Sequence, residues 1–107
     1  MTQRLAYLLQ LLEAAPQDTF LLFAIAKEQE KQGDLPQALA YYERLRTTDA
    51  SYVGLYYHLG KLYEQTGQEA SAIATYQAGM AVARRAGDAH ALSELAVAKL
   101  NLVDDDE

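Results

Sequence analysis

The chain has 107 residues, enough for one domain or a short array of repeats. Half of the residues are apolar and 22% are charged, which favours a folded chain over a disordered one. The absence of cysteine excludes disulfides, thiolate metal sites and a cysteine nucleophile, and a net charge of −6 argues against a nucleic-acid binder or a binder of anionic membranes.

Six segments show the spacing of apolar residues that is typical of helices. Asp18 is placed to cap the second segment, which stops at Gly33, and Pro36 stands in the first turn of the third, where its missing N–H costs least. Gly87 suits the position just after the fifth segment. No window alternates strictly between polar and apolar residues, so no strand is predicted. The predicted helices cover about residues 2–14, 18–32, 34–47, 51–66, 69–85 and 88–103.

The middle of the chain repeats itself after 34 residues. Superposing residues 22–50 on residues 56–84 matches two glycines that each stand between helical segments. The matches also include small and aromatic residues at helical spacing. The six identities are Lys27/Lys61, Glu30/Glu64, Gly33/Gly67, Ala38/Ala72, Ala40/Ala74 and Tyr42/Tyr76.

This period and pattern resemble the tetratricopeptide repeat, whose 34 residues follow W-x2-L-G-x2-Y, then A-x3-F, then P. The second copy has Tyr56-x2-Leu59-Gly60-x2-Tyr63, followed by Ala72-x3-Tyr76. The first copy has Leu22-x2-Ile25-Ala26-x2-Gln29, followed by Ala38-x3-Tyr42. The copies depart from the pattern where Ala50 and Arg84 replace the terminal proline, where Gln29 replaces an aromatic residue and where Gly79 replaces alanine.

The resemblance extends to both ends of the chain. The first segment matches the second helix of a repeat, with Leu8 and Leu11 at core positions, and the last matches a first helix used as a cap, after a step of 36 residues. The resemblance implies an all-α, right-handed α-solenoid of antiparallel helix hairpins. We expect a single domain with a leading half-repeat at 1–17, repeats at 18–51 and 52–87, a capping helix at 88–103 and an acidic tail at 104–107.

In this family, the first helices of successive repeats line a concave face that binds proteins or peptides. The resemblance therefore implies a non-catalytic protein-interaction module. Phe23 and Tyr57 share one repeat position, and Lys27 and Lys61 follow them one turn later. Such a face suits a peptide that carries an acidic or C-terminal carboxylate. The predicted groove residues are Phe20, Phe23, Lys27, Lys31, Tyr57, His58, Lys61 and Gln65.

Two alternatives stay open at this point. The charged residues of this face are equally compatible with plain solvation, with Glu30 and Glu64 neutralising the two lysines. The chain is also compatible with weak homo-oligomerisation, in which the helix that carries Leu5, Leu8 and Leu12 packs against a copy of itself or against a partner's repeat.

Motifs for catalysis are not found. The sequence has no Gly-rich phosphate loop, no Gly-x-Ser-x-Gly elbow and no His-Glu-x-x-His motif, so we expect neither enzymatic activity nor a cofactor. His90 has Glu94 one turn later, a spacing that is typical of a solvated pair rather than of a metal site. We interpret the tyrosines at positions 42, 56, 63 and 76 as core residues rather than as a stacking site.

The longest apolar run, Phe20 to Ala26, is far shorter than the roughly 20 residues that span a bilayer. Arg4 followed by the leucines at 5–12 imitates a signal peptide, but Gln10 and Glu13 interrupt it. We therefore expect a cytoplasmic protein that binds neither membrane nor nucleic acid.

Overall fold

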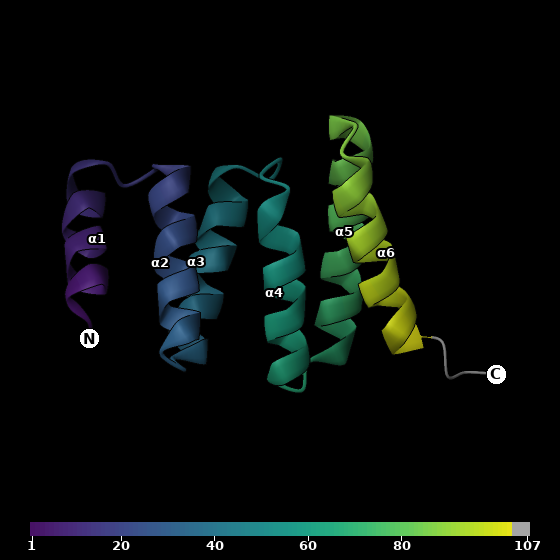
Figure 1. Ribbon diagram of the computed structural model, residues 1–107, viewed down its shortest axis with the longest axis horizontal. Coiled ribbons are helices and arrows are strands. Elements are labelled where there is room, and N and C mark those ends of the chain that lie inside the picture. The colour runs from purple at the N-terminus through teal and green to yellow at the C-terminus, as the bar shows by residue number, and fades with distance from the viewer. Residues whose placement is uncertain (104–107) are drawn as a thin grey trace. The chain divides into compact units, whose positions relative to one another are not determined.

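The computed structural model describes residues 1–103, which form six α-helices and no strand (Figure 1). The all-α class and the six predicted helices are confirmed. One start was misplaced, because the fourth helix begins at Gly54 instead of Ser51. The predicted acidic tail at 104–107 lies outside the described residues. The helices are α1 (Gln3–Ala14), α2 (Thr19–Lys31), α3 (Leu35–Thr48), α4 (Gly54–Gln65), α5 (Glu69–Ala86) and α6 (Ala89–Val103).

Short polar side chains fix where most of the helices begin. Each cap accepts a hydrogen bond from a backbone N–H of the first turn, which has no partner inside the helix. Gly33 and Gly67 follow the ends of α2 and α4 with φ of 80° and 75°, values that side chains with a Cβ rarely adopt. The capping oxygens are those of Thr2 (3.1 Å to the Leu5 nitrogen), Asp18 (3.0 Å to Leu21), Asp34 (3.3 Å to Gln37) and Asp88 (3.0 Å to Ala91).

The helices group into two compact units, Met1–Ala50 and a second that begins at Ser51. We call them unit 1 and unit 2. In unit 1, α2 packs against both α1 and α3. In unit 2, α5 packs against both α4 and α6, and α4 also contacts α6. Each unit therefore contains one antiparallel hairpin of the repeat and one additional helix that lies against it.

The leucine stripe of α1 is internal. Leu5, Leu8 and Leu12 are only 6%, 7% and 5% exposed, because α1 turns this stripe toward α2, the helix that it contacts in unit 1. The prediction that these three leucines are available for self-association was therefore wrong. The large apolar residues that α1 leaves exposed are Tyr7 and Leu11.

A buried carboxylate adds a polar connection between α1 and α2. Glu28 of α2 is 8% exposed, and its Oε1 lies 3.2 Å from Nε of Arg4. Its Oε2 accepts hydrogen bonds from Thr2 and Gln32 at 3.4 and 3.3 Å. Because a buried carboxylate is stable only when it is paired and hydrogen-bonded, this cluster holds the Arg4 side chain against α2.

Two glycines allow the helices of unit 2 to approach closely. A Cβ at Gly60 of α4 would lie 2.6 Å from Cδ1 of Tyr76 in α5. A Cβ at Gly79 of α5 would lie 2.5 Å from the Cβ of Tyr56 and 3.0 Å from Leu95 of α6. The space that the glycines leave is therefore filled by the two buried tyrosine rings.

We expect Gly79→Ala to lower the free energy of unfolding by about 1 to 3 kcal/mol, because the added methyl group overpacks against the Cβ of Tyr56, which is fixed to the backbone. Helix propensity alone predicts a gain of about 1 kcal/mol. Gly54→Ala is the matched control, since its nearest neighbour would be Tyr52 Cε1 at 3.7 Å, and it should leave stability unchanged or slightly higher. Urea denaturation of both variants measures the difference. A gain for Gly79→Ala would contradict the close packing.

Gln29 stands at the repeat position that Tyr63 occupies in the second copy, and it is 5% exposed. Its Oε1 is buried without a hydrogen-bond partner. Since a buried unpaired polar atom costs about 1 to 3 kcal/mol, we expect Gln29→Met to raise the free energy of unfolding by about 1 kcal/mol. Thermal and urea unfolding measure the change. A loss of stability would contradict the assignment of an unpaired oxygen.

Candidate functional site

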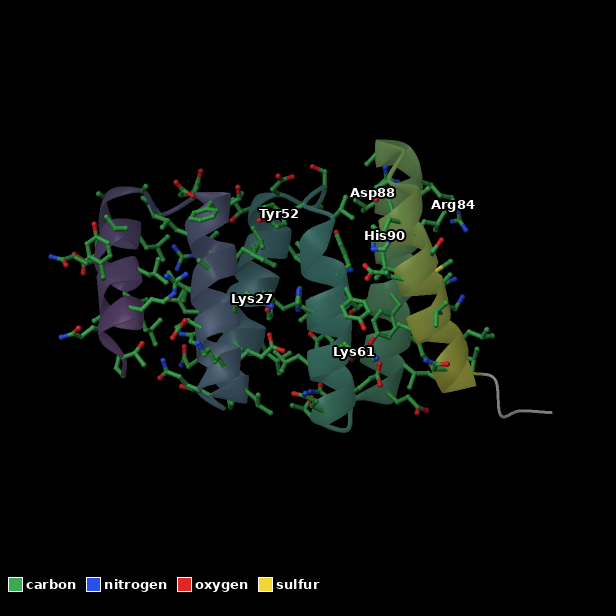
Figure 2. The ribbon with its side chains drawn as sticks, viewed as in Figure 1. Lys27, Tyr52, Lys61, Arg84, Asp88 and His90 are labelled. Atoms are coloured by element: carbon green, nitrogen blue, oxygen red, sulfur yellow. The ribbon has the colours of Figure 1, made fainter. Side chains whose placement is uncertain are left out.

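Two adjoining hollows run along the facing sides of α4 and α6 in unit 2. They have volumes of about 340 and 400 Å³ and share Tyr57, His90 and Glu94, so they form one continuous surface. Figure 2 shows Lys61 of α4 and His90 of α6 on this side of the unit. We call it the α4–α6 groove. Its polar and apolar walls comprise Tyr57, His58 and Lys61 of α4 with His90, Ser93, Glu94, Val97 and Asn101 of α6.

The α4 wall combines an aromatic ring with an ammonium group. Lys61 follows Tyr57 by one helical turn, and its Nζ lies 5.5 Å from the centre of the Tyr57 ring. The same Nζ lies 3.7 Å from Oε2 of Glu64. The Tyr57 ring is itself supported by the buried ring of Tyr76, with a centroid distance of 6.5 Å. The ring and the ammonium group are therefore held together at the groove surface.

A buried tyrosine of α5 fixes the position of the Glu64 side chain. The buried hydroxyl of Tyr76 donates a hydrogen bond to its Oε2, and in unit 1 the hydroxyl of Tyr42 donates to Oε1 of Glu30 at 2.8 Å. Burial, followed by these hydrogen bonds and the nearby carboxylate charge, raises the pKa of both tyrosines well above its usual value. Each glutamate is thus an acceptor that a buried hydroxyl requires, in addition to any role on the surface.

The α6 wall is more exposed and of mixed character. His90 and Glu94 lie one turn apart, with Nε2 to Oε2 at 3.5 Å, and their side chains are 85% and 51% exposed. Val97 presents an apolar surface that is 57% exposed, next to the amide of Asn101. The groove therefore offers a cation on one helix and an apolar patch with a carboxylate on the other.

The predicted residues of unit 1 lie together on one face of α2, at spacings of three, four and four residues. Phe20 is 69% exposed, and Lys27 and Lys31 are also exposed. The ring of Phe23 packs edge-on against Tyr42 with centroids 6.1 Å apart, whereas the equivalent pair Tyr57 and Tyr76 is tilted, with an interplanar angle of 43°. We call Phe20, Phe23, Lys27 and Lys31 the α2 strip.

The two predicted lysines differ in their surroundings. Lys61 pairs with Glu64, as the solvation alternative requires. In the part of the chain that the structure describes, Lys27 forms no ion pair with Glu30, whose Oε1 accepts from Tyr42 instead. Neutralisation of both lysines by the glutamates of their own repeats therefore holds for one copy only.

The structure brings three of the predicted residues, Tyr57, His58 and Lys61, into the α4–α6 groove. Gln65 lies exposed at the end of α4 and lines neither hollow. The α6 wall was missed, although the 36-residue step already contained the signal. A shift of 36 residues superposes Glu94 on His58 and Val97 on Lys61, two of the predicted groove residues. The missed residues are His90, Ser93, Glu94, Val97 and Asn101.

Within residues 1–103, no group of three or more His, Asp or Glu side chains is arranged to hold a metal ion. The helices of the same residues include none with the length and hydropathy needed to cross a bilayer.

Paired antiparallel helices with a 34-residue period, and small residues where the helices meet, define a helical-repeat protein. The family model of the tetratricopeptide repeat matches residues 30–100. The chain belongs to the tetratricopeptide repeat family, and the fold class predicted from the sequence is confirmed.

Solved structures share this fold. A tetratricopeptide repeat domain protein from Salinibacter ruber is similar in both a crystal and an NMR structure, with 46% identity and TM-scores of 0.78 and 0.80. The matches cover 83% and 86% of this chain and 99% and 93% of those chains. A protein from Bordetella parapertussis is 24% identical with a TM-score of 0.84, over 99% of this chain and 92% of that one, and supports the fold alone.

The chain is also similar to part of a much longer protein, the surface lipoprotein assembly modifier 2 of Haemophilus influenzae. The identity is 47% over 62 residues, which are 56% of this chain and 13% of the relative.

The raised pKa values of Tyr42 and Tyr76 predict a loss of stability in alkali. The unfolded chain releases the tyrosine protons near pH 10.0, whereas the folded chain retains them. The contribution of these two tyrosines to the free energy of unfolding should therefore be constant below about pH 10 and fall above it, by up to about 1.4 kcal/mol per pH unit for each tyrosine. The double variant Tyr42→Phe/Tyr76→Phe should be less stable at neutral pH and should lose less on going to about pH 11. Urea denaturation across this range measures both effects. Parallel curves for the two proteins would contradict the assignment.

Proposed function

We propose that the α4–α6 groove binds a peptide segment of a partner protein through a carboxylate and a neighbouring apolar side chain. Tetratricopeptide repeat domains are in general modules for protein–protein interaction, and they act as scaffolds rather than as catalysts. The observation that carries the proposal for this chain is the ammonium group of Lys61, held over the Tyr57 ring at the wall of a hollow.

The chemistry of the groove favours such a ligand. Lys61 forms an ion pair with Oε2 of Glu64, the oxygen that also accepts from Tyr76, so a second carboxylate would gain a charge-assisted hydrogen bond to the ammonium group. Val97 and the face of Tyr57 provide apolar contact area within the same hollow. Glu94 and the overall charge of −6 disfavour peptides that carry many negative charges, which gives the groove selectivity for a single carboxylate.

The α2 strip repeats this combination in unit 1, with exposed lysines beside Phe20 and Phe23. We propose that it contacts the partner as well. Gln65, at the end of α4, is proposed as a polar contact outside the two hollows.

The cytoplasmic location remains a prediction. The H. influenzae relative is named for the assembly of surface lipoproteins. That name favours testing extracytoplasmic proteins, including lipoproteins, as partners beside cytoplasmic ones.

The test begins with a library of octapeptides that have free C-terminal carboxylates, selected on the immobilised protein. The best-bound peptide is then titrated by fluorescence anisotropy against wild type, Lys61→Glu and Lys27→Glu. We expect Lys61→Glu to weaken binding by about tenfold or more, because the substitution replaces an attraction by a repulsion. Salt should weaken the wild-type complex, since exposed charges are screened beyond about 8 to 10 Å.

Lys99→Glu is the matched control, because it makes the same charge change on α6 outside the residues that line the groove. It should change affinity little, and every variant should keep its stability within about 0.5 kcal/mol. An effect of Lys27→Glu would assign the α2 strip to the interface. Equal affinity of Lys61→Glu and wild type at two salt concentrations would refute the groove as the binding site.

A further inference from the structure

The two hollows of the α4–α6 groove carry different charges. The hollow of about 340 Å³ is lined by Lys61, whereas the hollow of about 400 Å³ is not. The larger hollow is lined instead by Asp88, which does not line the smaller one. Tyr57, His90 and Glu94 line both. We call the smaller one the lysine hollow and the larger one the acidic hollow.

The two carboxylates of the acidic hollow can each accept a further hydrogen bond. Asp88 caps α6 through Oδ1, which accepts from the Ala91 nitrogen at 3.0 Å, and its Oδ2 has no donor among the described residues. Glu94 lies 3.5 Å from Nε2 of His90, and its side chain is 51% exposed. An imidazole in its neutral form leaves the negative charge of Glu94 in place. Both carboxylates are therefore able to bind a cationic group.

The helix dipoles reduce this negative charge without cancelling it. α4 begins at Gly54 and α6 begins at Ala89, so the N-terminal ends of both helices lie at the acidic hollow. An N-terminus is equivalent to roughly half a positive charge, so two of them leave about one net negative charge from the two carboxylates. Lys61 lies further along α4, toward its C-terminal end. The charge of the groove wall therefore changes sign between the two hollows.

The ring of Tyr57 adds a second attraction for a cation. It lines both hollows, and an ammonium or guanidinium group is attracted to an aromatic ring within about 6 Å of its centre. The Nζ of Lys61 already makes such a contact at 5.5 Å. A cationic group in the acidic hollow would lie beside the same ring as well as beside the two carboxylates.

Helix geometry fixes how far apart the two charges of a ligand should be. Lys61 follows Gly54 by seven residues and His58 by three, so it lies about 5 to 10 Å further along α4 than these residues of the acidic hollow. Side chains two residues apart on an extended peptide point to the same side and lie about 7 Å apart. Figure 2 shows Asp88 and Lys61 toward opposite ends of this side of unit 2, with His90 between them. One extended peptide can therefore reach both hollows.

We propose that the acidic hollow binds a Lys or Arg side chain of the peptide, two residues away from the residue whose carboxylate lies at Lys61. This contact rests on the proposed function of the groove and extends it from a single carboxylate to a pair of opposite charges. The overall charge of −6 does not repel a peptide in which these two charges cancel. Asp88 and Glu94 then determine specificity, because a second carboxylate at this position of the peptide would meet like charge.

The octapeptides selected on the immobilised protein provide the first measurement. We expect Lys or Arg to be enriched two residues from the carboxylate that binding requires. The best-bound peptide and a derivative with Gln in place of this basic residue are then titrated by fluorescence anisotropy. The Gln derivative should bind wild type about threefold to tenfold more weakly, because it loses two exposed charge contacts.

Two isosteric variants test the protein side of the contact. Asp88→Asn retains a good helix cap while it removes the charge, and Glu94→Gln removes the other charge. Each should weaken the parent peptide by about twofold to fivefold and leave the affinity for the Gln derivative unchanged. Glu13→Gln is the matched control, since it removes the charge of an exposed glutamate on α1, and it should change neither affinity.

Glu94→Lys gives a sharper test, because it should reverse the preference. A peptide with Glu in place of the basic residue should bind this variant more tightly than the parent peptide does. A merely structural role of Glu94 does not produce this reversal. Circular dichroism establishes that every variant is folded.

The outcomes separate this contact from the proposed function. If Lys61→Glu weakens binding, but basic residues are not enriched and the isosteric variants affect both peptides equally, the acidic hollow is overturned and the carboxylate contact stands. If Asp88→Asn and Glu94→Gln weaken the parent peptide alone while Lys61→Glu has no effect, the acidic hollow stands and the contact at Lys61 fails. If none of the three variants has an effect, or if no peptide is selected, both are refuted.

Discussion

The buried tyrosine of each hairpin is the constraint on which the arrangement of the surface depends. The Tyr76 ring fills the space opposite Gly60, and Ala26 holds the equivalent repeat position in the hairpin of Tyr42. Each buried hydroxyl must then find an acceptor inside its hairpin. A glutamate one turn after that small residue supplies it. The requirement fixes the rotation of the first helix and so determines which of its residues face solvent. Lys61 and Tyr57 lie at the groove because Glu64 is committed to Tyr76.

The two copies solve the same packing problem with different residue sizes. In the second copy Tyr56 adjoins Gly79, and the 34-residue register places Leu22 and Leu45, both buried, at the equivalent positions of the first copy. The larger residue on one helix of the second copy is thus balanced by a smaller one on the other. This exchange explains why Gly79 can replace the alanine of the repeat pattern without leaving a cavity.

Much of the fold follows from local sequence signals. Asp18, Asp34 and Gly87 mark helix ends because their chemistry satisfies backbone groups, and these boundaries agree with the structure within about two residues. The start of α4 was less predictable, because its cap residue Val53 makes no side-chain hydrogen bond, and Ser51 looks like the better cap. Caps depend on backbone geometry that the residue type alone does not determine.

The candidate site was less predictable than the fold. Repeat position correctly placed Tyr57 and Lys61 together, since four residues separate them on one helix. It did not predict that Glu30 would be engaged by Tyr42 while Lys27 stays without a carboxylate, because that outcome depends on side-chain rotamers across two helices. The α6 wall was missed for a different reason. A capping helix is expected to cover the neighbouring helix, but the exposed side of α6 also lines the groove.

One face of helix α6 lines the α4–α6 groove. Residues 90, 94, 97 and 101 face α4 and line the groove. Ser93 also borders the groove, whereas Ala96 and Leu100 do not line it. In an α-helix one residue corresponds to a rotation of about 100°, so positions that differ by one lie on separate sides of the helix. Glu94, Val97 and Asn101 can therefore line the groove while Leu100, one residue before Asn101, lies outside it.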